Sequence, residues 1–317
     1  MDTNMKIPSF WSRVSAFLID LVILSIIGYI FGIGFESYLS SIGNYALLFG
    51  MIITLFYFTI FNSKIFKGQT IGKKLVNVEV VDKNGNFISL AQSLYRSLIL
   101  IVPYFTVNIK VPGIEYSSFL DLLIKIVLTL LIIGVIVFYI FNKGNRQSLH
   151  DILAGTYVIS TVRQEEYFPM PKVKKLSVYI FYILTFFLIG FSFYNYRIAI
   201  TQYKTLMTIS KKLQDINGVI NASVSKNLST FYGEKKSTTK SYNVSLTLAK
   251  IPNRISDVED MSIVKKGVDI ILKNETNIDS LDIISVTVNS GFNLGIAKKF
   301  KSYTIRKNPA DWKKLID

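Results

Sequence analysis

The chain has 317 residues, of which 50% are hydrophobic and only 18% charged, and its mean hydropathy is +0.39. This composition excludes a soluble or disordered chain, because soluble domains carry about 25% charged residues. The sequence contains no cysteine and one histidine, His150, which excludes disulfide frameworks, thiolate–metal sites and multi-histidine metal sites, and no cofactor is expected. The net charge of +15 falls largely in loops beside apolar segments, which favours anionic lipid over nucleic acid as its counterpart.

Apolar segments near the length of a bilayer crossing, about 20 residues, predict about five transmembrane helices. The segments are Val14–Phe31, Tyr45–Phe61, Leu98–Val107, Phe119–Phe141 and Ser177–Tyr194. The third is short and contains Pro103, so it either crosses the membrane or re-enters it. No N-terminal signal peptide is expected, because the first segment carries an acid, Asp20, in its middle.

Two loops hold most of the positive charge between these segments, which predicts that both are cytoplasmic. They are Asn62–Arg96 and Asn142–Lys175, whereas Gly32–Asn44 and Asn108–Ser118 contain a single cation, Lys110. Five crossings with a cytoplasmic N-terminus satisfy this distribution. The expected protein is therefore a multi-pass plasma-membrane protein whose residues 201–317 are extracytoplasmic.

Both cytoplasmic loops contain strand-like patterns. Leu75–Val81 alternates apolar and polar residues, Asn84-Gly85 supplies a turn, and Phe87-Ile88 resumes the apolar pattern, which predicts a small β-hairpin. Gly155–Ile159 predicts a further strand. We expect it to pair with the hairpin and join the two loops.

A series of motifs in this half of the chain, taken in order, resembles the RDD family of bacterial membrane proteins over about residues 8–160. The motifs are Phe10-Trp11-Ser12-Arg13, Ile19-Asp20, Gly68-Gln69-Thr70-Ile71-Gly72-Lys73, Val80-Val81-Asp82, Arg96 and Leu149-His150-Asp151-Ile152-Leu153-Ala154-Gly155-Thr156. The resemblance implies that Arg13, Asp20 and Asp151 are the arginine and two aspartates for which the family is named. It also implies a bacterial plasma membrane and, from suggestions made for some members, transport by cation/proton antiport.

Asp20 follows Arg13 by two helical turns, about 10 Å deeper in the first span. An ionised carboxylate at that depth costs several kcal/mol unless it is paired or hydrated. Two roles fit it. Asp20 either binds a proton or cation, with Arg96 or Lys125 as competing partner, or forms a buried interaction that fixes helix packing.

His150 and Asp151 follow the fourth span. One histidine beside one aspartate does not make a hydrolase site, and nothing else supplies a nucleophile with a base and an oxyanion donor, so no enzyme is expected. Asp151 is expected to cap a helix or to pair with Arg13 or Lys73. The alternative is a proton-sensing or gating site, because histidine titrates near neutrality.

A glycine-containing motif lies in the first cytoplasmic loop and consists of Gly68, Gln69, Thr70, Gly72 and Lys73. It lacks the four-residue gap and the final Ser/Thr of a phosphate-binding loop. We expect a turn whose lysines meet lipid headgroups.

Residues 201–317 predict two α-β-β units, which make a two-layer α+β domain (αββαββ) with helices on one face of an antiparallel sheet. The helices are expected at Leu206–Ile216 and Val258–Leu272, and the strands at Val219–Val224, Tyr242–Ala249, Leu281–Val288 and Ser302–Lys307. This part is basic, so an anionic lipid surface or a cell-wall polymer is its expected neighbour.

The predicted organisation is an RDD-like four-helix membrane domain over residues 1–165, a linker and fifth transmembrane helix over 166–200, and the extracytoplasmic domain over 201–317. Two functions remain open. One is transport of a cation or small solute. The other is a non-catalytic adaptor that presents the C-terminal domain to an envelope partner. The expected contacts are the lipid bilayer and a protein partner or a second copy of the chain, without nucleic acid.

Overall fold

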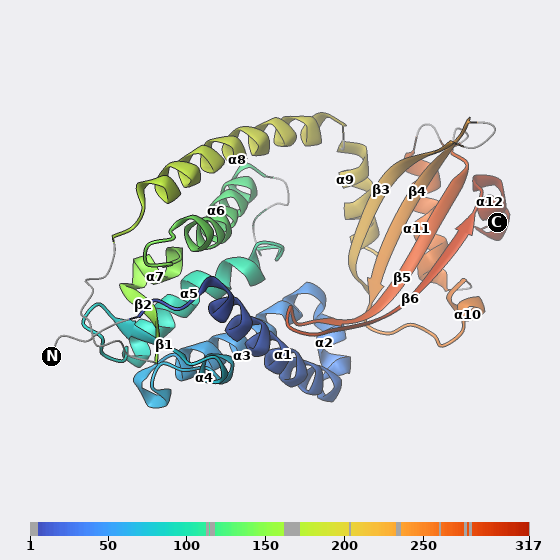
Figure 1. Cartoon of the computed structure of the whole chain (residues 1–317). Helices are drawn as coiled ribbons and strands as arrows, with labels where there is room; N and C mark the ends of the chain where they lie inside the picture. The colour runs from blue at the N-terminus through green and yellow to red at the C-terminus, as the bar shows by residue number, and fades with distance from the viewer. Residues whose placement is uncertain are drawn as a thin grey trace. The chain divides into compact units, whose positions relative to one another are not determined.

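The computed structural model describes residues 6–111, 114, 118–161, 172–202, 204–232, 236–259, 261–275, 278 and 281–316 (Figure 1). The chain forms two compact units. The first, the helical unit, contains Met1–Phe31, Leu47–Tyr196 and Leu294–Ala297; the second, the sheet unit, contains Gly32–Ala46, Arg197–Asn293 and Lys298–Asp317. The predicted domain boundary between residues 165 and 166 lies outside the described residues.

Most of the first 202 residues are helical. In chain order the elements are α1 (Phe10–Gly34), α2 (Glu36–Ile42), η1 (Gly43–Tyr45), α3 (Ala46–Phe61), η2 (Lys64–Phe66), α4 (Ile71–Leu75), β1 (Val78–Asp82), α5 (Leu90–Thr106), α6 (Phe119–Phe141), α7 (Leu149–Ala154), β2 (Thr156–Ser160) and α8 (Lys175–Gln202). Within the described residues, four helical stretches are long and apolar enough to cross a membrane: Phe10–Gly34, Glu36–Phe61, Phe119–Phe141 and Lys175–Ile198. These coincide with four of the predicted spans.

The remaining predicted span, Leu98–Val107, lies in the C-terminal part of α5. This helix has 17 residues and includes Arg96, which is buried. Its length is about 25 Å, shorter than the roughly 30 Å hydrocarbon core of a bilayer. Only its last residues, beyond Arg96, form an apolar run. The number of crossings therefore stays a prediction.

The two loops predicted to be cytoplasmic are joined by a sheet, as expected. Strand β1 pairs antiparallel with β2, with Val80 opposite Val158. The predicted hairpin is only partly correct, because its second arm contributes one bridge, Val81 to Phe87, and no strand. The carboxylate of Asp82 instead accepts hydrogen bonds from the backbone N–H of Asn84 and of Asn86, so the turn closes on itself.

The C-terminal elements form a two-layer α+β fold in the order predicted. They are α9 (Lys204–Gln214), β3 (Val219–Tyr232), β4 (Lys236–Leu248), α10 (Ile255–Glu259), α11 (Ser262–Asn274), β5 (Ile283–Asn293), β6 (Lys298–Lys307) and α12 (Pro309–Ile316). The sheet order is β3-β4-β5-β6. The prediction of an all-antiparallel sheet is wrong, because the central pair, β4 with β5, is parallel. Helices α10 and α11 carry the chain back along the sheet between these strands, so both run the same way.

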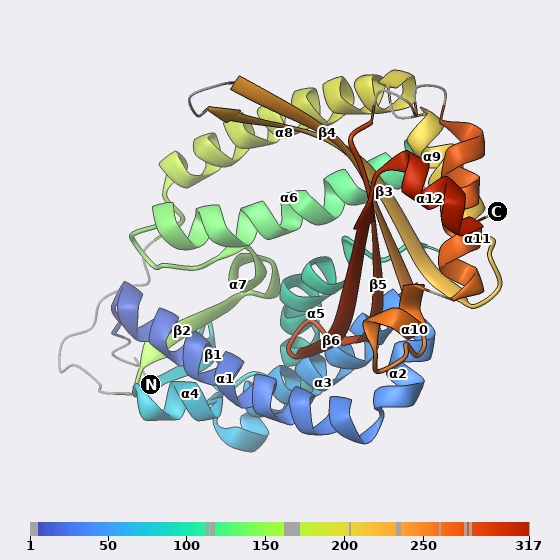
Figure 2. The ribbon, with the colours of Figure 1, turned by 90° about the vertical axis from the view of Figure 1, so that its right-hand side faces the viewer.

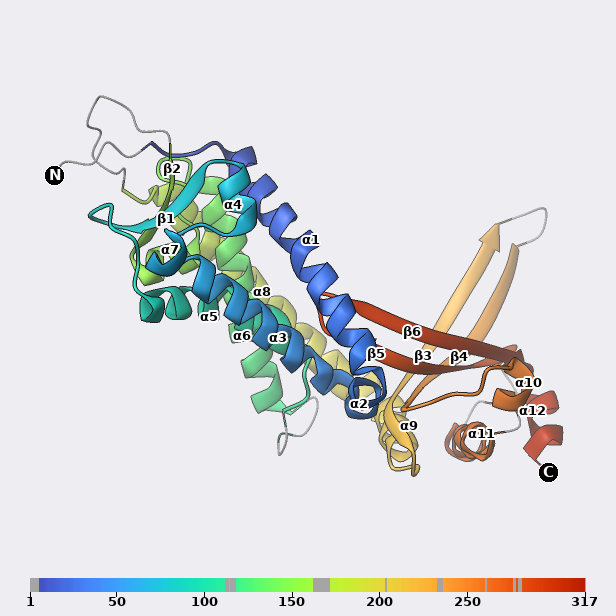
Figure 3. The ribbon, with the colours of Figure 1, turned by 90° about the horizontal axis from the view of Figure 1, so that it is seen from below.

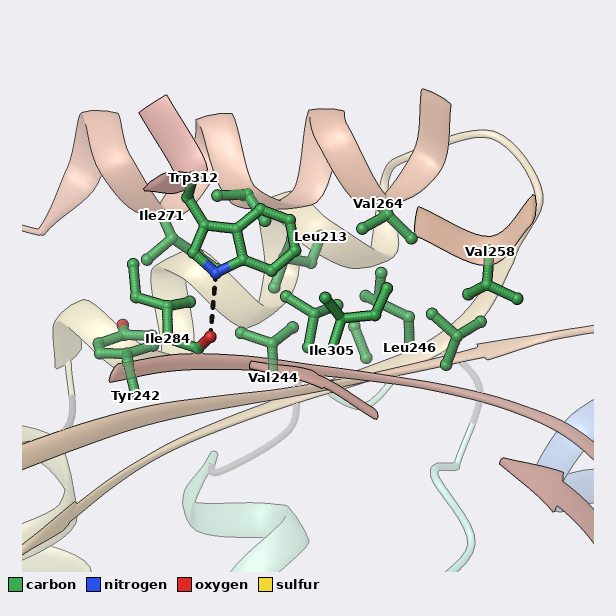
Figure 4. Packing of buried hydrophobic residues seen from close by; sticks show 14 of the residues in the cluster. Leu213, Tyr242, Val244, Leu246, Val258, Val264, Ile271, Ile284, Ile305 and Trp312 are labelled. Carbon is green, nitrogen blue, oxygen red and sulfur yellow. Dashed lines mark hydrogen bonds between the residues drawn. The ribbon is translucent and has the colours of Figure 1, made fainter. Parts of the chain in front are cut away.

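One hydrophobic core stabilises the α+β fold. Alternate residues of the strands face helices α9, α11 and α12, and every buried member of this cluster lies between Ile209 and Trp312. Figure 4 shows Trp312 over Ile284, with the indole N–H donating to the Ile284 carbonyl oxygen at 3.0 Å. Burial of apolar side chains on this scale is the main stabilising term of a small domain.

Candidate functional site

Buried polar side chains gather at one end of the helical unit, where β1, β2, α4 and α7 lie together (Figures 2 and 3). We call this group the inner polar cluster. In and around it lie the motif residues that the sequence singled out, though not Lys125: Arg13, Asp20, Gly68, Gln69, Thr70, Gly72, Lys73, Arg96, His150 and Asp151. Its contacts separate into one group around Asp151 and one around Asp20.

Asp151 is fully buried and is held by two arginines. The Arg13 guanidinium donates to Oδ2 at 2.8 Å. The Arg96 guanidinium donates to Oδ1 through Nε at 2.9 Å and through NH2 at 2.7 Å. Burial alone would raise the pKa of the Asp151 carboxyl, but the charges of Arg96 and Arg13 outweigh it and hold the pKa well below its usual range. Asp151 is therefore ionised near neutral pH and paired with both arginines.

Local structure explains why Asp151 lies where both arginines reach it. Ser148 begins α7 and forms a capping box with Asp151, the third residue of the helix. The preceding loop contains Arg146, whose backbone has φ of 52° and whose carbonyl oxygen accepts a second hydrogen bond from Arg13. Arg13 also lies over the ring of Tyr139, 5.0 Å from its centroid. One arginine thus connects α1, α6 and α7.

His150 is buried beside this group. Its Nδ1 lies 2.7 Å from the hydroxyl of Ser148. Burial, together with the charges of Arg96, Arg13 and Lys73, lowers the pKa of His150 to about 3, against the opposing effect of Asp151. The imidazole is therefore neutral near pH 7. The predicted alternative, a histidine that senses protons near neutrality, does not fit this environment.

Asp20 is as buried as Asp151 but has a different set of partners. Oδ1 accepts hydrogen bonds from the hydroxyl of Tyr57 at 2.6 Å and from the backbone N–H of Gly72 at 2.8 Å. Oδ2 accepts from the hydroxyl of Thr70 at 2.6 Å. Among the described residues no cationic side chain forms an ion pair with Asp20. The predicted partners bind elsewhere, since Arg96 pairs with Asp151 and Lys125 pairs with Asp121 on its own helix at 2.8 Å.

The Gly68–Lys73 motif brings these donors to Asp20. Gly68 has φ of 66°, and a Cβ there would overlap the carbonyl oxygen of Val80. Gln69 Nε2 donates to the carbonyl oxygen of Val78 at 3.1 Å, which ties the turn to β1. Thr70 caps α4 by accepting from the N–H of Lys73 at 3.2 Å while its hydroxyl donates to Asp20. The motif is thus a folded connection between a transmembrane helix and the small sheet.

Lys73 does not extend to lipid headgroups as expected. Its ammonium donates instead to Asn62 Oδ1, at the end of α3. Burial and the nearby charge of Arg96 lower the pKa of Lys73 well below its usual value, although Asp20 and Asp151 act in the opposite direction. The amine lies within electrostatic reach of both aspartates and pairs directly with neither.

Two uncharged members of this site could not be identified from sequence motifs. Tyr57 and Asn62 lie in or beside an apolar helix, and their types carry no motif of their own. A search for hydroxyl and amide groups near the span ends that border the basic loops would have found them. No group of three or more histidine, cysteine, aspartate or glutamate residues that would hold a metal ion occurs among the described positions.

Comparison with known proteins bears on the same half of the chain. Residues 7–155 match the RDD family. The chain is 25% identical over 164 residues to the uncharacterized protein YckC of Bacillus subtilis (strain 168), which covers 51% of this chain and 89% of YckC. No solved structure matches the chain. The aligned region contains both aspartates and both arginines of the inner polar cluster.

Proposed function

We propose that this chain, whose residues 7–155 form an RDD family domain, is a bacterial plasma-membrane transporter that exchanges a monovalent cation or small solute for protons, with Asp20 as the coupling carboxylate. One observation carries this proposal. Asp20 is a buried carboxylate in a membrane-spanning helix, and its hydrogen bonds come from Tyr57, Thr70 and Gly72, none of which is charged. Acids inside membrane spans mark ion and proton pathways.

The contrast with Asp151 supports this assignment. Two arginines already compensate the charge of Asp151, so a proton or cation would have to displace a guanidinium to bind there. Among the described residues Asp20 has no directly bonded counter-charge, and its nearest influence of that kind is the Lys73 amine, which acts at a distance. A proton or a monovalent cation would neutralise it, and the hydroxyl oxygens of Tyr57 and Thr70 are the hard oxygen ligands that such cations accept.

The contacts at this end of the helical unit also support a topology. The β1–β2 pair and the bond from the Ser160 N–H to the Lys6 carbonyl oxygen, 2.8 Å, hold the N-terminal segment and both basic loops together. These loops are rich in lysine, so we assign this end to the cytoplasm. Because α5 and α6 lie between the two loops, the pair must cross the bilayer an even number of times. The apolar end of α5 then enters the membrane with α6, and α8 takes the C-terminal domain to the outside.

We also propose that the protein is not an enzyme. The polar groups of the inner polar cluster bond one another, and the hydroxyl that lies beside the imidazole, that of Ser148, is buried in the capping box of α7. His150, the only imidazole in the chain, is neutral and bonded to Ser148.

The direct test is cation-induced collapse of a proton gradient in everted vesicles, with sodium, lithium and potassium each added to vesicles that contain wild type or Asp20→Asn. We expect flux in wild type and a loss of at least tenfold in Asp20→Asn, because the neutral amide no longer exchanges a proton. Asp121→Asn is the matched control, since Asp121 is an acid on another membrane helix and is paired with Lys125.

Two outcomes would contradict the proposal. Equal flux in Asp20→Asn and wild type would make Asp20 a packing residue. If none of the three cations gave more flux than in empty vesicles, antiport of these cations would be excluded. The purified variants should elute from a size-exclusion column at the same volume as wild type. This control separates a loss of coupling from a loss of folding.

A second candidate function is a non-catalytic adaptor that presents the C-terminal domain to an envelope partner. The observation that favours it is the sheet face opposite the core, which carries hydroxyl and amide side chains in register. One row across the four strands consists of Ser223, Ser245, Thr287 and Thr304, and the next of Asn221, Thr247, Asn289 and Ser302. Such a face offers hydrogen bonds to a hydroxyl-rich cell-wall polymer.

A further inference from the structure

The turn that joins strands β5 and β6 is apolar. It consists of Leu294, Gly295, Ile296 and Ala297, and the Leu294 N–H closes it by donating to the Ala297 carbonyl oxygen at 2.8 Å. Turns between strands are normally polar, because they lie in water. Here Leu294 is fully buried, and all four residues belong to the helical unit although both flanking strands belong to the sheet unit. We call residues 294–297 the β5–β6 turn.

Glycines on two membrane helices make room for this turn. A Cβ on Gly50 of α3 would overlap the carbonyl oxygen of Leu294. A Cβ on Gly28 of α1 would lie 2.8 Å from Ile296 Cδ1. Because real Cβ atoms essentially never approach so closely, larger residues at these two positions would push the turn away. The turn therefore packs directly against the backbones of α1 and α3.

The turn also contacts α5 and the apolar cluster around Tyr57. Gly295 has φ of 76°, and a Cβ there would lie 2.6 Å from Cε1 of Phe105 on α5. Ile296 packs against the cluster that contains Phe105 and Tyr57, and among the described members of that cluster it is the one that does not come from α1, α3 or α5. Tyr57 is the residue whose hydroxyl donates to Asp20.

The β5–β6 turn and the inner polar cluster lie on opposite sides of Asp20 along the helices. Gly28 follows Asp20 by eight residues of α1, about 12 Å, whereas Arg13 precedes Asp20 by seven. On α3, Gly50 precedes Tyr57 by seven residues, about 10 Å. The proposed topology assigns the inner polar cluster to the cytoplasmic end. The turn then occupies the approach to Asp20 from the extracytoplasmic side.

We propose that the β5–β6 turn is a plug that closes the extracytoplasmic approach to Asp20, and that it leaves the helices when a cation reaches this carboxylate from outside. The inference rests on the proposed function. The turn lies outside residues 7–155, which match the RDD family, so the plug is a feature of the C-terminal part of this chain.

The contacts of the turn suit a reversible plug. None of its four side chains is ionisable, so its withdrawal breaks no ion pair of its own. The ion pair that follows it on β6, Lys299 with Glu36 at 2.7 Å, joins partly exposed side chains and therefore contributes little to stability. The alternative is a fixed clamp that stays in place throughout transport.

The absence of native cysteine allows the turn to be locked in place. A Cβ on Gly28 would lie 3.2 Å from the Cβ of Ala297, close to the separation of about 3.5–4.5 Å found in disulfides, so Gly28→Cys combined with Ala297→Cys should crosslink when oxidised. In everted vesicles we expect oxidation to lower cation flux at least tenfold and dithiothreitol to restore it. Each single-cysteine variant is a matched control and should not respond to the oxidant. Equal flux before and after crosslinking would show a fixed clamp and overturn the plug.

A second measurement does not depend on flux. Leu294→Cys, as the sole cysteine of the full-length chain in lipid nanodiscs, would be treated with a charged methanethiosulfonate, which reacts with a hydrated thiolate. We expect it to react at least tenfold faster than Leu246→Cys. Leu246 is the matched control because it is equally buried, in the hydrophobic core of the sheet unit on β4.

The labelling rates separate failure of the plug from failure of the proposed function. Equally slow labelling of the two cysteines would overturn the plug even if wild type exchanges cations. Fast labelling of Leu294→Cys in a protein without flux would support a turn that leaves the helices while removing the transport proposal.

Discussion

Two aspartates of the same family motif have opposite electrostatic surroundings. Asp151 lies between two guanidinium groups, whereas Asp20 is bonded to two hydroxyls and one backbone N–H. Removal of one partner from a buried ion pair costs about 3–5 kcal/mol, because it leaves an uncompensated charge. Asp151 therefore stabilises the fold, whereas under the proposed transport function Asp20 is the residue whose charge a ligand changes.

The lowered pKa of His150 predicts how the free energy of unfolding depends on pH. Its pKa is about 3 in the folded protein and about 6.5 when unfolded, so below pH 6.5 the unfolded chain binds a proton that the folded chain does not. The stability that neutral His150 contributes is complete above pH 6.5 and is lost as pH falls towards 3. We expect a loss of about 2 kcal/mol between pH 6.5 and 5.

This loss would be measured by thermal unfolding of the purified protein in detergent at both pH values, with His150→Gln as comparison. The glutamine variant keeps a hydrogen-bonding group near Ser148 but has no proton to gain. A variant that loses as much stability as wild type over this range would show that His150 is not the responsible group.

For single residues, the sequence predicted which charged side chains belong to the candidate site. It did not predict their hydrogen-bond partners. Arg13, Asp20 and Asp151 were identifiable because they belong to a recurring motif, and ionisable groups near a membrane span are costly enough to be conspicuous. Tyr57 and Asn62 were not, because a hydroxyl or an amide in an apolar helix is compatible with many packings. Their role depends on α4 folding back against α1, which no local pattern specifies.

Among the elements, α4 depends on close contact with α1. A Cβ on Gly72 would overlap the carbonyl oxygen of Ala16 and would lie 2.9 Å from Asp20 Oδ1. We expect Gly72→Ala to displace α4, break the bond from the Gly72 N–H to Asp20, and destabilise the protein by about 1–3 kcal/mol. Flux in everted vesicles should fall with it.

Gly190→Ala on α8 is the control for this substitution. No atom lies within 4 Å of its added Cβ, so the change should be neutral or slightly stabilising through helix propensity. Thermal unfolding in detergent compares the two variants. Similar midpoints would mean that α4 does not need the glycine to approach α1.

The elements were predictable where one physical requirement dominates. Phe119–Phe141 was predicted to the residue, because a bilayer demands an uninterrupted apolar helix. Pairing of β1 with β2 followed from their alternating patterns. The parallel pairing of β4 with β5 did not, because strand direction is set by the path of α10 and α11 rather than by the strands. The distal parts of β3 and β4 were also not predicted, because their residues are mostly polar and show no alternation of apolar and polar residues.

For the whole molecule, the C-terminal domain is expected to fold without the membrane helices. All residues of its hydrophobic cluster, partly buried members included, lie between Leu206 and Ile316. Residues 204–317 expressed alone should therefore unfold cooperatively. Trp312, fully buried and the only tryptophan of that segment, should report the transition as a red shift of its emission.

This isolated domain also separates the two candidate functions. Under the adaptor function it should cosediment with purified cell-wall polymer, and replacement of Ser245 and Thr287 by alanine, which removes two hydroxyl groups from its polar face, should weaken binding. Under the transporter function it need not bind.

A broad, non-cooperative transition or water-exposed tryptophan emission in the isolated segment would contradict the prediction that residues 204–317 fold independently.

The charge pairs at Asp151 have a consequence for biosynthesis. Arg13 and Arg96 are 138 and 55 residues ahead of the aspartate with which both pair. At about 5–20 residues per second of translation, Arg13 emerges from the ribosome roughly 7–28 s before its counter-ion. The first helices thus enter the bilayer with unpaired arginines near its surface, and the RDD domain closes only when α7 is made. A chain that stops between α5 and α7 would keep both arginines without the carboxylate that pairs with them.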